Sequence, residues 1–293
     1  MQINRIATVF VNANKAGTLA EYRDVNNLAA RESYVFTYAE EYLTHGAPIG
    51  HHFPLTKTRY EFDALPPFFS NVLSEGWLRA HQATKARLDK SDEFGLLCAN
   101  GEELIGAVSV VAGEVDTLPT DRFIQLPIPK PRTLKDKGVV IVGTSRTFND
   151  YAVDHANGQS ISGVQRKLMM KLQGNQLVPT ARGGQYIVKP APEGVPYCPE
   201  NEFFIMSLAN KVGFNTAECG LVPFEDGELA YVTKRFDILN ENERYLIEDG
   251  ASLCLVHPKH KDSEALSYET VLKRLSQVAG NSKAVTLTLF FPH

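Results

Sequence analysis

The residues best suited to chemistry in this 293-residue chain are a lysine and a glutamate that follow a polar loop. Lys189 ends the short apolar segment YIVK, and Glu202 lies near the start of the next helical segment, NEFFIMSLANKV. Upstream of both, the loop GQSISGVQRK carries Gly158 and Gly163. A nucleotide-phosphate site of the kinase type uses a loop of backbone N–H groups, a lysine on the following strand and a glutamate on the next helix. The order of these segments therefore predicts such a site.

Each part also has a simpler interpretation. Lys189 could be an edge-strand lysine that extends its ammonium group to water, and Glu202 could be an acidic residue favoured at a helix start by the helix dipole. The loop has no G-x-G-x-x-G pattern, so it departs from ordinary protein kinases and from the P-loop.

Histidine pairs are a second candidate for chemistry, as metal ligands. His51 and His52 are adjacent, and His257 and His260 flank Pro258. Neither pair has a carboxylate or cysteine at a metal-site spacing, and Pro258 indicates a loop. We expect surface or turn histidines here and no metal site. A melting temperature raised by Zn²⁺ would favour the alternative, an unrelated α+β enzyme that uses the histidines.

Composition sets broad limits. The length favours about two domains, and 43% hydrophobic with 22% charged residues is typical of a globular chain. The net charge of −4 gives no basic field for nucleic acid. We find no apolar run of 18 residues and no secretory signal, so no membrane span is expected. The four separate cysteines predict free thiols in a reducing cytoplasm.

Residues 1–112 are dense in short strand and helix signals. Strands are predicted at 6–11, 34–38 and 103–111, with turn chemistry over 12–17. A helical stretch is predicted over 65–88, interrupted by Gly76, and Ser91 is expected to open a second short helix.

The remaining chain divides in two. Residues 113–157 contain four prolines, which predict a linker or extended arm followed by one strand at 138–143. Residues 158–293 predict an antiparallel sheet with a hairpin around Gly227, and two amphipathic helices. The first helix, 201–212, has an apolar stripe at helical spacing, as does the second, 268–279. The apolar stripes are Phe204, Ile205, Leu208 and Val212 in the first, and Tyr268, Val271, Leu272, Leu275 and Val278 in the second.

Several motifs together resemble those of the HipA family, the serine/threonine kinase toxins of bacterial toxin–antitoxin modules. In residues 158–293 they are SISGVQRKL, YIVKP, ENEFFIMSLA and VTKRFD. In residues 1–112 they are LPPFFSNVLSEGW, DEFGLL and ELIGAVSV. The resemblance covers roughly residues 5 to 250. It implies an α+β chain, with a HipA-type N-terminal subdomain (1–112), a connecting segment (113–157) and a kinase small-lobe-like region (158–293) with one αC-like helix.

The resemblance also implies roles for particular residues. Ser160 matches the loop serine that these kinases autophosphorylate, and Ser162 matches the second serine of the Ser-x-Ser variant. A phosphate at Ser160 would occupy the space meant for ATP's phosphates, expel the loop and switch the enzyme off. The resemblance implies three groups of ATP-binding residues. The loop supplies backbone N–H groups from Ile161, Ser162, Gly163, Val164 and Gln165, and Glu202 orients Lys189 toward the phosphates. The hinge that lines the adenine contains Lys234 and Phe236.

The match ends before the catalytic lobe of the family. Phosphoryl transfer there uses a catalytic-loop Asp, a nearby Asn and a further Asp for Mg²⁺. Between 250 and 293 we find none of these, and Asp249 and Asp262 are interpreted as surface acids. We therefore expect a HipA-like chain truncated before that lobe, with ATP and Mg²⁺ as family cofactors but no Mg²⁺ ligands of its own. Alone, it is expected to show no kinase turnover.

Partners follow from the same resemblance. It implies a HipB-like DNA-binding antitoxin and, in full-length relatives, a translation-related protein substrate such as an aminoacyl-tRNA synthetase, with no direct contact to nucleic acid or membrane. The alternative is a non-catalytic, HipA-derived binding module that docks an antitoxin, a repressor or a second kinase half through residues 1–112.

Overall fold

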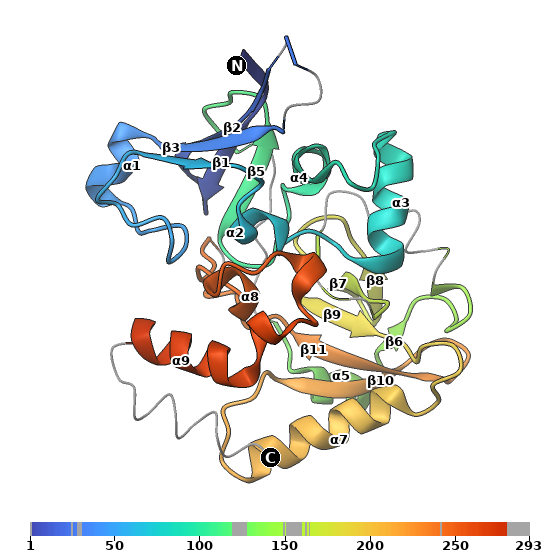
Figure 1. The fold of residues 1–293 in the computed structure, drawn as a ribbon. Helices are drawn as coiled ribbons and strands as arrows, with labels where there is room; N and C mark the ends of the chain where they lie inside the picture. Colours follow the sequence, from blue (N-terminus) through green and yellow to red (C-terminus); the bar gives the residue numbers. More distant parts are fainter. Residues whose placement is uncertain are drawn as a thin grey trace. The chain divides into compact units, whose positions relative to one another are not determined.

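The computed structural model describes residues 2–24, 26–27, 31–118, 128–148, 150, 160–161, 163, 165–240 and 242–279. The chain divides into two compact units, and Figure 1 shows their elements. Unit 1 comprises Met1–Leu73, Ala86–Thr120 and Tyr245–His293. Unit 2 comprises Ser74–Lys85 and Asp121–Arg244. The units therefore differ from the predicted ranges 1–112, 113–157 and 158–293. The chain after residue 244 belongs to unit 1, together with the N-terminal part.

Unit 1 contains a five-stranded antiparallel sheet in the order β4-β3-β2-β1-β5. Its strands are β1 (Gln2–Val11), β2 (Asn14–Arg23), β3 (Ser33–Tyr38), β4 (Arg59–Phe62) and β5 (Val108–Ala112). The predicted strands are confirmed, but the last begins five residues later than expected.

The predicted turn over 12–17 is wrong in extent. The turn is only two residues long, with Asn12 at a φ of 53°, and β2 starts at Asn14. Gly17 lies inside β2, paired with Tyr38. A Cβ on Gly17 would stand 2.1 Å from the carbonyl oxygen of Thr37, so the glycine permits close backbone approach rather than a turn.

Short helices accompany the sheet of unit 1. They are α1 (Glu40–His45), α2 (Pro67–Ser70), α4 (Glu93–Asn100), α8 (Gly250–Leu253), the 3-10 turns η1 (Pro258–His260) and η2 (Glu264–Leu266), and α9 (Tyr268–Val278). The cap of α4 is Asp92, which accepts a hydrogen bond from the Gly95 N–H, and not Ser91 as expected. A carboxylate one residue nearer the helix reaches that N–H directly.

The segment after residue 244 is held to unit 1 by backbone groups. The Ala107 N–H donates to the Tyr245 carbonyl at 2.9 Å, and Asn71 Nδ2 donates to the Val256 carbonyl at 2.9 Å. These contacts join residues more than 130 positions apart, which sequence periodicity does not reveal.

Unit 2 contains a six-stranded sheet in the order β10-β11-β9-β7-β8-β6. Its strands are β6 (Val140–Ile141), β7 (Leu168–Gln173), β8 (Gln176–Pro179), β9 (Tyr186–Lys189), β10 (Cys219–Pro223) and β11 (Leu229–Lys234). Pairing is antiparallel except between β6 and β8, which are parallel. The predicted hairpin around Gly227, with a φ of 84°, is confirmed.

Part of the predicted linker is instead ordered structure. Pro131 is the first residue of α5 (Pro131–Asp136), which packs on β10 where Gly220 lacks a side chain. The core of unit 2 includes Leu134 of this helix, β-strand residues such as Val188, and Leu78 of α3 (Gly76–Ala86). The prolines at 119 and 127 lie outside the described residues.

The helix α7 (Cys198–Lys211) lies along β10 and β11 (Figure 1). The helix itself is confirmed, starting three residues earlier than expected. Its predicted apolar stripe does not face a core, however, because Phe204, Ile205, Leu208 and Val212 are 46–65% exposed. In α9 likewise no side chain is buried, and Tyr268 is 79% exposed.

Candidate functional site

Lys189 and Glu202 form an ion pair in unit 2. Lys189 is the last residue of β9, opposite Tyr231 of β11, and Glu202 lies in the second turn of α7. The lysine Nζ is 2.5 Å from the glutamate Oε1 and 5.3 Å from the centre of the Tyr231 ring. The two side chains are 21% and 27% exposed, so the ammonium group is oriented by its partners but remains reachable. Burial raises the pKa of the Tyr231 hydroxyl above its ordinary value, so this ring stays neutral.

Within residues 160–165 of the predicted phosphate loop, the structure describes four positions. Ser160 and Ile161 are buried, and Ser160 Oγ lies 3.2 Å from Ser74 Oγ. Gly163 has a φ of 98°, a conformation that favours glycine. Gln165 donates its Nε2 hydrogen to Cys198 Sγ at 3.9 Å. Ser162 and Val164 lie outside the described residues.

These contacts bring the loop, the lysine and the glutamate into one neighbourhood. Gln165 contacts Cys198 at the start of α7, and Glu202 lies four residues further, on the same face of that helix. Glu202 in turn holds Lys189.

Lys234 and Phe236 lie at the opposite end of β9. Lys234 pairs with Tyr186, three residues from Lys189, which corresponds to about 10 Å along the strand. Its Nζ is 3.5 Å from a carboxylate oxygen of Glu218. Phe236 is 66% exposed. Neither residue contacts the lysine–glutamate pair among the interactions of the described residues.

The hinge segment contains an ion pair that the sequence did not predict. Arg235 donates from Nε and Nη2 to both carboxylate oxygens of Asp237, at 3.0 and 2.6 Å, and both side chains are at most 2% exposed. The same guanidinium donates to the Gly184 carbonyl and contacts the sulfur of Met169, each at 3.2 Å. The pair thus ties the end of β11 to β7 and to the loop before β9. In the sequence, the Arg-x-Asp spacing could have indicated this ion pair, because residues two apart lie on the same side of an extended chain.

A cavity of about 360 Å³ opens at the same end of the sheet as Lys189. Its lining includes two cations and two acids: Arg146, Arg166, Glu193 and Glu228. Arg166 directly follows the loop residue Gln165, and Ala191 lies two residues beyond Lys189. The volume is in the range of small-ligand sites.

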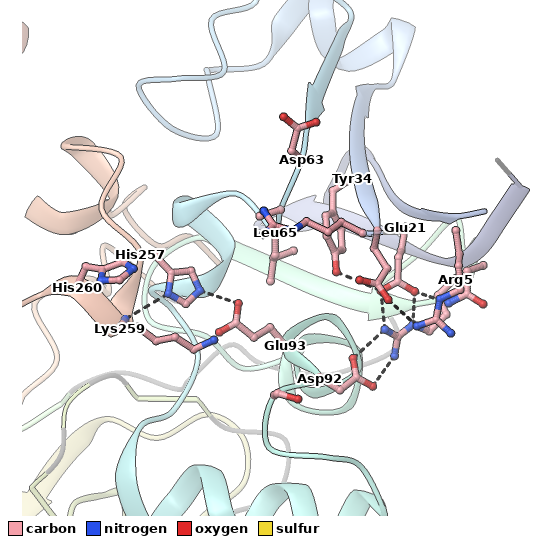
Figure 2. Close-up of a pocket in the computed structure, with 16 residues that line it drawn as sticks. Arg5, Glu21, Tyr34, Asp63, Leu65, Asp92, Glu93, His257, Lys259 and His260 are labelled. Carbon is pink, nitrogen blue, oxygen red and sulfur yellow. Dashed lines mark hydrogen bonds and ion pairs between the residues drawn. The ribbon is translucent and has the colours of Figure 1, made fainter. Parts of the chain in front are cut away.

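A larger cavity, about 920 Å³, lies within unit 1 (Figure 2). On one side of it Arg5 binds Glu21 and Asp92 through four hydrogen bonds of 2.6–2.8 Å. Tyr34 Oη also donates to Glu21, whose side chain is only 1% exposed. On the other side His257 Nε2 lies 2.9 Å from a carboxylate oxygen of Glu93.

Arg5 offsets part of the negative charge of Glu21 and Asp92. The hydrogen bonds that Arg5 donates, first to Glu21 and then to Asp92, raise the Arg5 pKa, and burial raises the Tyr34 pKa. Burial would raise the pKa of Asp92, but hydrogen bonds from Arg5 and the Gly95 N–H outweigh it and hold the pKa below its ordinary value. This arrangement is that of a structural cluster, because the shifts hold Arg5, Tyr34 and Asp92 in their usual charge states.

The histidines do not form a metal centre within the described part of the chain. His52 Nε2 contacts the Leu253 carbonyl at 3.0 Å, and the described residues hold no group of three or more His, Cys, Asp or Glu that could bind a metal ion. None of the helices in the described ranges is long and apolar enough to cross a bilayer.

Two family models match the sequence. Residues 7–111 match the HipA N-terminal domain, and residues 159–292 match the HipA-like C-terminal domain. "Putative kinase Y4dM" of Sinorhizobium fredii is 33% identical over 218 residues, which is 71% of this chain and 49% of that protein. A "Putative kinase" of Haemophilus influenzae is 30% identical over 142 residues, covering 45% of this chain and 41% of the relative. The chain thus spans about half the length, or less, of these curated relatives.

The fold is similar to that of a solved toxin–antitoxin structure. The complex of Shewanella oneidensis HipA, HipB and operator DNA matches with a TM-score of 0.64 and 20% identity. The alignment covers 97% of this chain and 67% of the chain in that complex. At this identity the similarity concerns the α+β fold alone.

Proposed function

The chain belongs to the HipA-like family, and from this premise we propose that unit 2 forms the ATP-binding part of a HipA-like serine/threonine kinase. The observation that carries the proposal is the ion pair between Lys189 and Glu202. A lysine ammonium fixed by a helix glutamate is the arrangement that kinases use to bind the α- and β-phosphates. The adjacent loop containing Ile161, Gly163 and Gln165 would supply backbone N–H groups to the same phosphates, with Ser162 and Val164 in the same segment.

The described residues fit ATP better than they fit Mg²⁺. The partly accessible Lys189 suits a phosphate chain, and the cavity of about 360 Å³ near it is lined in part by Arg146 and Arg166. Asp237 is buried against Arg235, and no described cluster supplies metal ligands. We therefore name no Mg²⁺ ligand among the described residues, and propose nucleotide binding as the role of this part of the chain.

The partners proposed for the whole protein follow from the family. A HipB-like antitoxin is proposed as partner, since the similar structure is a complex of HipA with HipB and operator DNA. A translation-related protein in the cytoplasm, such as an aminoacyl-tRNA synthetase, is proposed as substrate. The alternative, a non-catalytic binding module, predicts antitoxin binding without ATP binding.

Replacing Lys189 by alanine is expected to weaken ATP binding at least tenfold. A hydrogen bond to a charged group contributes about 1.5–3 kcal/mol, and 1.4 kcal/mol corresponds to a factor of ten. Isothermal titration calorimetry with ATP measures this directly. Lys171→Ala is the matched control, because Lys171 lies on β7 of the same sheet outside the proposed site. Equal affinity of wild type and K189A would contradict the proposal.

Replacing Ser160 by glutamate is expected to lower the melting temperature and weaken ATP binding together. Ser160 is 1% exposed and touches Ser74, so a carboxylate there would have to be buried or would push the loop out. Differential scanning fluorimetry and ATP titration test this. Ser74→Ala, which removes one neutral hydrogen bond of about 1 kcal/mol, is the control and should retain ATP binding. An S160E variant with wild-type stability and affinity would exclude this role of the loop.

A further inference from the structure

A tyrosine ring lies beneath the ammonium group of Lys189. Tyr231 of β11 is 2% exposed and stands directly opposite Lys189 of β9 in the antiparallel register. Side chains opposite one another in such a pair project from the same face of the sheet. The lysine Nζ is 5.3 Å from the ring centre, within the range of about 6 Å over which an aromatic face attracts a cation. Tyr231 is therefore a second partner of the ammonium group besides Glu202.

The ring of Tyr231 is fixed in place by its own contacts. Its hydroxyl group hydrogen-bonds with the side chains of Cys219 and Thr233, which are paired with each other across β10 and β11. Its backbone lies between two strands, paired with Leu221 on one side and Lys189 on the other. A side chain that is buried and bonded at its far end has few alternative rotamers. The ring therefore gives the lysine a fixed point of contact.

The two partners of Lys189 act differently on an incoming phosphate. Glu202 carries a negative charge, which repels phosphate and competes with it for the ammonium group. The Tyr231 ring is neutral, because burial raises the pKa of its hydroxyl, and it attracts the cation through its quadrupole. It can hold the ammonium group while phosphate oxygens and the carboxylate share the three N–H donors. A cation placed before the ligand arrives saves part of the ordering cost of binding.

We propose that Tyr231 is a positioning residue of the ATP site, whose ring holds the ammonium group of Lys189 where the phosphates bind. The inference rests on the function proposed for unit 2 and adds a residue that acts on ATP only through Lys189. It concerns the ring and not the hydroxyl group. Tyr231→Phe is therefore expected to keep the ATP affinity within about twofold of wild type, because burial still confines the ring.

The first test detects the contact in the chain without ATP. In a chain with isotope-labelled lysine, NMR should show the Cε methylene protons of Lys189 shifted upfield by the ring current of Tyr231. Lys189→Ala should remove that signal, and Tyr231→Leu should return it to the ordinary lysine position. A wild-type Lys189 signal at the ordinary position would overturn the proposal.

The second test changes the charge distribution of the ring and hardly changes its shape. Position 231 is filled in turn with phenylalanine and with monofluoro-, difluoro- and trifluorophenylalanine, which progressively weaken the attraction of the ring face for a cation. The ATP affinity, measured by calorimetry, should fall at each step and by about three- to tenfold over the series. The same series at Phe148, whose ring packs against Phe224 in the core of unit 2, is the matched control and should leave the affinity unchanged.

A double-mutant cycle separates positioning from a general structural effect. Tyr231→Leu should weaken ATP binding in the wild type and add no further loss to K189A, because the ring acts only through the lysine. Constant affinity across the fluorinated series, or an equal loss from Y231L with and without Lys189, would overturn the proposal. A wild type that binds no ATP would overturn the function proposed for unit 2 and this role with it. Constant affinity in a chain that binds ATP would remove the role of Tyr231 alone.

Discussion

Replacing Asp237 by alanine is expected to destabilise unit 2 by about 3–5 kcal/mol, the cost of removing one partner from a buried ion pair. Arg235 would remain with a buried guanidinium whose two strongest hydrogen bonds, at 2.6 and 3.0 Å, are gone. For a unit of this size the change corresponds to a fall in melting temperature on the order of 10 °C. Differential scanning calorimetry of the whole chain measures it.

Two further variants make this expectation specific. Asp150→Ala removes an exposed carboxylate from the same unit and should change the melting temperature by no more than about 2 °C. Replacing both partners, Arg235→Met with Asp237→Leu, should restore most of the stability, because no uncompensated buried charge remains. A D237A variant that melts with wild type would show that Asp237 does not neutralise Arg235 in solution.

Replacing Arg5 by alanine is expected to cost about 3 kcal/mol in unit 1. Its guanidinium binds two carboxylates, and Glu21 is 1% exposed, so the substitution leaves a buried negative charge without its cation. The cap of α4 also loses its support, since Asp92 accepts from both Arg5 and the Gly95 N–H. Urea denaturation monitored by circular dichroism tests the loss.

The matched control for Arg5 is Arg59→Ala. Arg59 pairs with Glu61 on the surface, where the side chains are 52% and 70% exposed, and such pairs contribute about 0–1 kcal/mol. Similar losses for R5A and R59A would contradict the structural role of the Arg5 cluster.

Acidity should reduce the contribution of the Arg5 cluster. The pKa of Asp92 is lowered in the folded chain, so its contribution is fully present above its ordinary pKa of about 3.8 and is lost as the pH falls through the folded value. The stability difference between wild type and R5A should therefore be largest near pH 7 and narrow below about pH 4. A difference that widens on acidification would contradict this sign.

Local sequence signals predicted many elements of the fold. The β10–β11 hairpin, the strand YIVK and the helix after it were predicted from turn glycines, β-branched residues and helical spacing, and all three are present. The secondary-structure predictions failed where one residue type occurs in two kinds of local structure. Gly17 permits close strand pairing instead of a turn, and Pro131 starts a helix instead of continuing a linker.

For the candidate site, the sequence by itself determined the order of a loop, Lys189 and Glu202, and the family that this order suggests. Only the tertiary structure decided that the lysine meets the glutamate at 2.5 Å and that Arg235 and Asp237 are buried together. It also decided that the apolar stripe of α7 faces solvent. The physical reason is that periodicity reports which side chains share a face, whereas burial depends on what distant parts of the chain, or another chain, place against that face.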